Sequence, residues 1–112
     1  MKIMLSGLDR IMIPSLMPER ADKFEQLLSV EIEKIIGMSS DEFSEYGFFI
    51  NEEKKTAWDS DSVLKEKEFE LSDTHISFLK KRSKELHEAR ELTRYQALTC
   101  DKIDGIQIEK TK

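Results

Sequence analysis

Reactive and metal-binding residue types are scarce in this chain, whose 112 residues include one cysteine, Cys100, and two histidines, His75 and His87. A single cysteine excludes an intramolecular disulfide, which fits a reducing compartment. The histidines lie twelve positions apart, so even on one helix they cannot bind the same metal ion. We expect both histidines at the surface or at a helix cap, and Cys100 partly buried in a helix.

Glycine is also scarce, and Gly7, Gly37, Gly47 and Gly105 are all far from one another. A phosphate-binding loop needs several glycines within a few residues, so no such loop is predicted. No stretch approaches the ~20 apolar residues that span a bilayer. The apolar run at residues 1–5 is too short for a signal peptide. We therefore expect a cytoplasmic protein without a membrane segment.

Catalytic and cation-binding patterns are lacking as well. Residues 72–75 contain the residue types of a hydrolytic triad, but neighbours at a helix start generally cannot converge as a triad does, and helix capping explains them better. Two carboxylate pairs, Asp59 with Asp61 and Glu52 with Glu53, lack the spacing of a calcium loop. We expect no cofactor, no metal site and no enzymatic activity.

Charge is abundant and unevenly distributed along the chain. The composition, 38% apolar and 37% charged, is typical of a small soluble domain, and we expect residues 1–112 to form one. Residues 1–78 hold 9 Lys/Arg against 17 Asp/Glu, whereas residues 79–112 hold 9 against 6. The net charge of −5 disfavours general binding to nucleic acid, because an acidic chain repels phosphate.

Apolar periodicity predicts three helices in the first part of the chain. The first covers residues 6–16, where Pro14 either ends the helix or kinks it. The second covers 19–36 and has the clearest amphipathic pattern. Gly37 is expected to end it in the left-handed conformation. The third is a short acidic helix at 39–46, which begins with capping-box spacing.

The first predicted helix contains one charged side chain of special interest. Arg10 lies in an apolar run, and we expect it to have a structural role, either by reaching the surface or by pairing with Asp9 or Glu19. Three methionines also fall within residues 4–17. They could form a docking or dimer patch, or pack against the second helix, and the sequence leaves both open.

Alternating apolar residues predict a small antiparallel sheet after these helices. Residues 47–51 and 55–59 are expected to form a hairpin around a four- or five-residue loop. Residues 66–71 alternate strictly and are expected to be the third strand of the same sheet. Their outward glutamates would protect an exposed sheet edge from pairing with another chain.

Two more helices are predicted at 73–90 and 94–103, with one continuous helix as the alternative, and residues 104–112 form a tail with a short extended segment. The expected fold class is α+β, with helices packed on a three-stranded antiparallel sheet in a winged-helix-like order. The predicted core is a set of sixteen apolar residues. They are Leu8, Ile11, Phe24, Leu28, Ile32, Ile35, Phe43, Phe48, Ile50, Trp58, Phe69, Leu71, Ile76, Leu79, Leu86 and Leu98.

Several short motifs carry a resemblance that spans most of the chain. They are Leu8-Asp9-Arg10, Pro14-Ser15-Leu16-Met17-Pro18, Glu45-Tyr46, Trp58, and the strand Phe69-Glu70-Leu71 that leads into a long helix. This layout resembles a group of small phage and prophage proteins without assigned activity. The resemblance implies a product made in the cytoplasm of an infected or lysogenic bacterium. Small phage proteins often act by binding a host or phage protein, so it also implies a protein-binding role.

The charge pattern gives the leading functional hypothesis. Residues 39–73 hold 11 Asp/Glu against 4 Lys/Arg, so an acidic face could dock on a basic protein and inhibit a host defence system. The candidate partner-binding residues are its carboxylates. They are Asp41, Glu42, Glu45, Glu52, Glu53, Asp59, Asp61, Glu66, Glu68 and Glu70.

Other functions stay open. A basic stripe on the fourth predicted helix could contact nucleic acid or a second copy of the chain, although glutamates on the same helix interrupt it. The stripe consists of Lys80, Lys81, Arg82 and Lys84. A winged-helix-like regulator is one alternative, but its DNA-reading helix at 39–46 would carry no Lys or Arg. A phage assembly subunit and a small-ligand sponge with a pocket at a dimer seam are the others.

Overall fold

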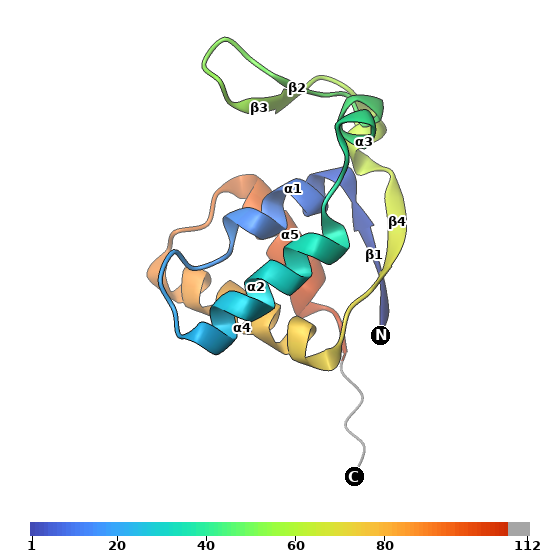
Figure 1. The fold of residues 1–112 in the computed structure, drawn as a ribbon. Helices are drawn as coiled ribbons and strands as arrows, with labels where there is room; N and C mark the ends of the chain where they lie inside the picture. Colours follow the sequence, from blue (N-terminus) through green and yellow to red (C-terminus); the bar gives the residue numbers. More distant parts are fainter. Residues whose placement is uncertain (108–112) are drawn as a thin grey trace.

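Residues 1–107, which the computed structural model describes, form five α-helices and two separate pairs of antiparallel strands (Figure 1). This is an α+β architecture, as the sequence predicted. The elements in chain order are β1 (Lys2–Ser6), α1 (Gly7–Ser15), α2 (Lys23–Ile36), α3 (Ser40–Glu45), β2 (Phe48–Ile50), β3 (Thr56–Trp58), the 3-10 helix η1 (Asp61–Leu64), β4 (Glu66–Glu70), α4 (Asp73–Ala89) and α5 (Arg94–Asp104). The last part of the predicted tail, residues 108–112, lies outside the described residues.

The predicted three-stranded sheet is wrong, because the third strand has a different partner. β4 pairs with β1, with Ile3 opposite Phe69 and Leu5 opposite Lys67, whereas β2 and β3 pair only with each other. The strand at residues 2–6 was not predicted. Ile3 and Leu5 are buried, whereas Lys2 and Met4 are exposed. Because Met4 is apolar, this alternation is hidden in the sequence.

The hairpin of β2 and β3 projects from one end of the molecule (Figure 1). Five residues, 51–55, connect its strands, which agrees with the predicted loop length. The Asn51 side chain organises this loop, because its Oδ1 accepts hydrogen bonds from the backbone N–H groups of Glu53 and Lys55. Since the hairpin forms a sheet of its own, the arrangement differs from the expected winged-helix order.

Side-chain caps set the ends of most helices. Ser6 and Asp9 form a capping box at the start of α1, which continues through Pro14 to Ser15. α2 begins at Lys23 instead of residue 19, because Asp22 accepts a hydrogen bond from the Glu25 N–H and so acts as the N-cap.

The expected left-handed cap at Gly37 is wrong, because its φ is −59°. Glycine is needed there for space. A Cβ atom would lie 2.8 Å from the Glu33 carbonyl oxygen, which is closer than real Cβ contacts allow.

The C-terminal region forms two helices, not one continuous helix, because the chain breaks sharply between α4 and α5. Arg90 adopts the left-handed conformation at φ 57° and ends α4, and Thr93 then begins α5 in a capping box with Gln96. At the other end of α4, Ser72 is the N-cap. Its backbone N–H donates a hydrogen bond to Nδ1 of His75. This confirms that His75 serves a helix cap.

Two apolar clusters fill the interior. The larger lies between β1 and the helices α1, α2, α4 and α5, and includes Leu5, Ile13, Ile32, Leu79 and Ile103, all without solvent exposure. The smaller lies under the hairpin. It consists of the buried residues Leu8, Tyr46, Phe48 and Val63, with Ile11, Met12, Met38, Phe43 and Trp58 packed against it.

Four predicted core residues are exposed. They are Phe24 at 63%, Ile35 at 37%, Ile50 at 59% and Leu98 at 60%. In α2 the buried stripe runs through Leu28, Ile32 and Ile36, so Phe24 and Ile35 lie to one side of it. The predicted pattern was too wide, because a helix with apolar residues around half its circumference does not show which part will be covered.

We predict that Leu5→Ala lowers the free energy of unfolding by about 2 to 5 kcal/mol, the usual range for deleting a buried leucine. Urea denaturation measures this effect. The matched control is Ile50→Ala, an exposed strand residue of the hairpin, whose effect should stay within about 0.5 kcal/mol. Equal effects of the two substitutions would contradict the placement of β1 in the core.

Candidate functional site

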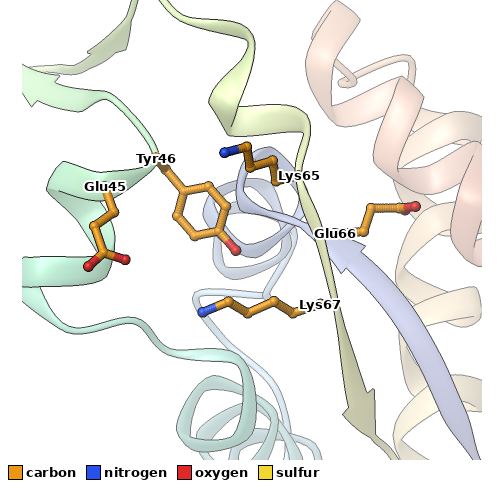
Figure 2. A pocket seen from close by; sticks show the side chains of 5 residues that line it. All are labelled: Glu45, Tyr46, Lys65, Glu66 and Lys67. Atoms are coloured by element: carbon orange, nitrogen blue, oxygen red, sulfur yellow. The ribbon is translucent and has the colours of Figure 1, made fainter.

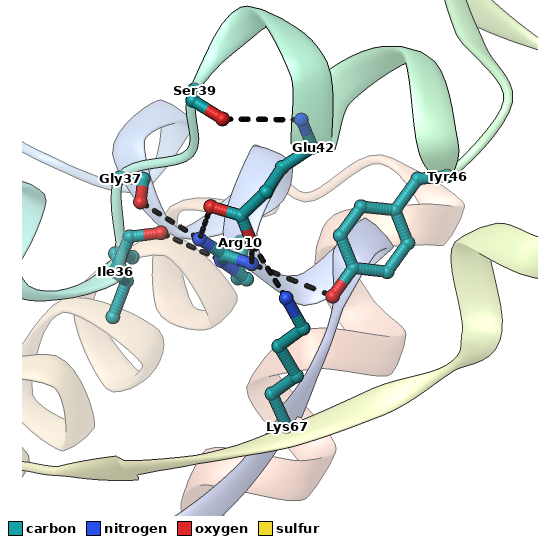
Figure 3. Close-up of polar contacts among 7 residues, drawn as sticks. All are labelled: Arg10, Ile36, Gly37, Ser39, Glu42, Tyr46 and Lys67. Atoms are coloured by element: carbon teal, nitrogen blue, oxygen red, sulfur yellow. Dashed lines mark hydrogen bonds and ion pairs between the residues drawn. The ribbon is translucent and has the colours of Figure 1, made fainter.

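Arg10 is buried in α1, and its guanidinium joins three other elements (Figure 3). Its Nε and Nη2 donate hydrogen bonds of 2.7 Å to the carbonyl oxygens of Ile36 and Gly37, at the carboxyl end of α2. Its Nη1 donates to Glu42 of α3 at 2.9 Å. The ring of Phe69 in β4 lies 4.8 Å from the guanidinium carbon. Arg10 therefore has the structural role that we expected, although its acidic partner is neither Asp9 nor Glu19.

Glu42 receives two cations in this cluster. Besides Arg10, the Nζ of Lys67 lies 2.8 Å from its carboxylate. Hydrogen bonds from Arg10 and then Lys67 lower the pKa of Glu42 to about 2, from its ordinary value of 4.5. Ser39 caps α3 by accepting from the Glu42 N–H, but the carboxylate turns to Arg10 instead of completing the capping box. One candidate partner-binding carboxylate is thus engaged inside the protein.

Asp9, the neighbour of Arg10, forms a second polar cluster on the other side of α1. Its carboxylate accepts hydrogen bonds from the Ser6 N–H and the Thr99 hydroxyl, and it pairs with Lys102 of α5. Lys102 also reaches Glu66 of β4 at 2.6 Å. Burial raises the pKa of Asp9, but the hydrogen bonds from Lys102, Ser6 and Thr99 outweigh it and the pKa is lowered overall.

A cavity of 230 Å³ lies beside the Arg10 cluster (Figure 2). The side chains of Lys65 and Lys67 lie on either side of the Tyr46 ring, and Glu66 points away from them. Glu45 of α3 completes the lining. Lys67 is already paired with Glu42, so Lys65 is the second lysine that the cavity offers, beside the largely covered ring of Tyr46. It has charge for holding a small polar group, and it lacks a cysteine, serine or histidine that could act as a nucleophile or base.

The net negative charge of the chain is concentrated at the end that carries the hairpin. Residues 39–64, which we call the acidic end, hold seven Asp/Glu and two Lys, so their net charge equals the −5 of the whole chain. The acidic end comprises α3, the hairpin and η1. Five of its carboxylate side chains are exposed and form no ion pair with another described residue. These are Asp41, Glu45, Glu52, Asp59 and Asp61.

The remaining candidate carboxylates lie near cations of the same chain. Glu53 is 3.8 Å from Lys55 within the hairpin loop. On β4, Glu66 pairs with Lys102, Glu68 with Lys2, and Glu70 with the N-terminal amino group. The structure therefore separates the predicted acidic face into a free part at the acidic end and a part on β4 that is neutralised locally.

The four basic residues of α4 do not form one continuous free surface. Lys81 pairs with Glu25 of α2 at 2.8 Å. Arg82 turns inward and donates from its Nε to the carbonyl oxygen of Leu16. Lys80 is half-buried, and Lys84 is exposed.

The other reactive residue types have structural surroundings. His75 is buried at its helix cap, and its Nε2 lies 3.6 Å from Glu31. Cys100 is buried, and burial raises the pKa of its thiol, so the nucleophilic thiolate form is disfavoured. Within residues 1–107, no three His, Cys, Asp or Glu side chains gather as a metal site.

Several apolar residues near the acidic end are exposed, which was not predicted from the sequence. Phe49 and Ile50 lie on the hairpin, Leu64 on η1, and Tyr95 and Leu98 on α5. The one indication in the sequence was that these segments contain more apolar residues than one buried face needs. Ile50 and Leu98 were assigned to the core because their partners in space could not be identified.

Comparison with known proteins gives no further guide, because no family model, no curated protein and no solved structure matches this chain. The structure adds one finding on membranes. Up to residue 107, it contains no helix with the length and apolar composition that crossing a bilayer requires.

We predict that Arg10→Met lowers the free energy of unfolding by about 2 to 4 kcal/mol, because it removes the buried partner of a partly exposed ion pair and leaves two carbonyl groups without donors. Arg10→Lys should restore little of this, since an ammonium group cannot bind all three acceptors with the same geometry. Lys65→Met, at an exposed position, is the control in urea denaturation. If Arg10→Met were as mild as this control, the cluster would not organise the fold.

A second prediction concerns pH. The folded-state pKa of Glu42 is lowered to about 2, so its ionised form stabilises the protein above its ordinary pKa of 4.5. This stabilisation is lost as the pH falls from 4.5 to 2. Urea midpoints measured across this interval should fall less steeply for Glu42→Gln than for the unchanged protein. Glu45→Gln serves as the control, and an identical pH dependence of all three proteins would refute the assignment.

Proposed function

We propose that this protein has no enzymatic activity and acts by binding another protein through its acidic end, residues 39–64. The observation that carries this proposal is the group of five exposed carboxylates that form no ion pair with any residue of the described range 1–107. Outside the acidic end, 16 Lys/Arg balance 16 Asp/Glu. The molecule is therefore neutral over most of its sequence and strongly negative at one end, which orients it toward a positively charged surface as it approaches.

The acidic end also has the apolar surface that a protein interface needs. Phe49 is 41% exposed and Ile50 is 59% exposed, and both lie on the projecting hairpin. Charged groups mainly set the rate and specificity of association, whereas burial of apolar side chains supplies much of the affinity. Because both occur together, a folded protein with a basic surface is a better partner than nucleic acid.

The biological role that we propose follows from this chemistry and from the phage-like layout of the chain. The protein acts in the cytoplasm of a bacterial host, where it covers the basic surface of a host protein, such as the nucleic-acid-binding groove of a defence protein. A cluster of carboxylates resembles the phosphates that such a groove binds. Occupation of the groove would inhibit the host protein without any chemical step.

The test is affinity capture of the tagged protein from lysate of a bacterial host, at low and high salt, with mass spectrometry. An acidic-end variant carries Glu45→Gln, Glu52→Gln, Asp59→Asn and Asp61→Asn. A matched control carries Glu19→Gln, Glu33→Gln, Glu88→Gln and Glu91→Gln, four exposed carboxylates outside the acidic end. Both variants change the net charge by the same amount.

We expect a host protein that is retained in stoichiometric amounts at low salt by the unchanged protein and by the control variant. The acidic-end variant should lose it, and high salt should release it, because exposed charges are screened. Equal loss from both variants would mean that net charge, and not the acidic end, governs binding. Capture of the protein alone would favour an assembly role over inhibition.

A further inference from the structure

A groove of 370 Å³ lies between β3, η1 and α5, at the base of the acidic end. Its walls are mainly apolar, and they come from segments far apart in the sequence. The apolar side chains that line it are Leu8, Trp58, Val63, Leu64, Tyr95 and Leu98. Leu64 and Leu98 are 58% and 60% exposed, so each presents most of its surface to solvent.

Two of the residues that line this groove, Trp58 and Tyr95, pack against each other. The rings of Trp58 and Tyr95 lie 4.9 Å apart at 75°, an edge-to-face contact between the hairpin and α5. Trp58 also packs edge-on against Phe48, which in turn stacks on Phe43. The wall of the groove is thus an extension of the smaller apolar cluster, so binding there does not require the wall to be ordered first.

The rim of the groove is negative. Asp59 and Asp61 line it, both are exposed, and neither forms an ion pair in the part of the chain that the structure describes. Its lining contains no lysine or arginine. An apolar floor beneath two unpaired carboxylates disfavours nucleic acid and acidic peptides, because their charges would be repelled and the apolar floor would stay uncovered.

We infer that this groove is the anchor site for a basic, aliphatic segment of the partner protein, in which Leu or Ile lies next to Lys or Arg along the chain. The aliphatic side chain covers Trp58, Tyr95 and Leu98, and the cation lies between Asp59 and Asp61. A cation in this place also faces the aromatic rings, which attract positive charge. The inference rests on the proposed function and names the part of the acidic end that recognises the partner.

Trp58 makes the inference directly measurable, because it is the only tryptophan of the chain and it lines the groove. Its emission reports on whatever covers that surface. The probe is a synthetic peptide that repeats Leu-Lys-Lys-Leu. Two matched peptides repeat Leu-Glu-Glu-Leu, with the opposite charge, and Ser-Lys-Lys-Ser, with the same charge but no aliphatic side chains.

We expect the Leu-Lys-Lys-Leu peptide to shift Trp58 emission to shorter wavelength in a saturable titration. The other two peptides should bind at least about tenfold more weakly, which corresponds to about 1.4 kcal/mol. Leu98→Ser, and separately Asp59→Asn with Asp61→Asn, should weaken binding of the first peptide by a similar factor. Leu27→Ser, at an exposed leucine of α2, should leave it unchanged.

Leu64→Ser provides a second groove variant, and far-ultraviolet circular dichroism checks that each variant is folded. Equal binding of the Leu-Lys-Lys-Leu and Ser-Lys-Lys-Ser peptides, or unchanged binding by both groove leucine variants, would overturn the inference. The proposed function is judged separately. A host protein retained by Leu98→Ser but lost by the four-carboxylate variant would support binding at the acidic end and place the anchor outside the groove.

Discussion

The structure depends on two adjacent buried charges of opposite sign in α1. Neighbouring residues on a helix point about 100° apart, so Asp9 and Arg10 reach different elements. Asp9 binds Thr99 and Lys102 of α5, and Arg10 binds the end of α2 and Glu42 of α3. Burying either charge alone would be strongly unfavourable. Each is stabilised because several polar groups from distant parts of the chain meet it, and this requirement specifies how those parts are arranged.

The Arg10 cluster also determines where the acidic end lies. Arg10 and Lys67 both bind Glu42, which fixes α3, and the hairpin follows α3 directly. Elsewhere, Glu66, Glu68 and Glu70 have cations of the same chain beside them. Among the candidate partner-binding carboxylates, those that form no ion pair with another described residue therefore all lie at the acidic end. An interaction that stabilises the fold thus also positions the surface that we propose for binding.

Much of the local structure was predictable from the sequence, because its causes are local. Helix caps such as Ser39 and Thr93 act on groups three residues away, and the loop of the hairpin is organised by its own Asn51. The strand β1 was not predictable in the same way, because its partner β4 follows more than sixty residues later. The exposure of Ile50 and Leu98 escaped prediction for the same reason. Their apolar character was clear, but which surface covers them depends on the whole fold.

The sequence by itself determined the α+β class, most helices and both strands of the hairpin, and the concentration of negative charge in its middle part. These properties follow from the periodicity, the caps and the composition of short segments. Only the tertiary structure decided that Glu42 is bound internally while Asp59 and Asp61 pair with no cation among residues 1–107, and that Trp58 and Tyr95 together line a groove. The physical reason is that pairing between charges, and contact between apolar side chains, depend on distance in space, which separation along the chain does not specify.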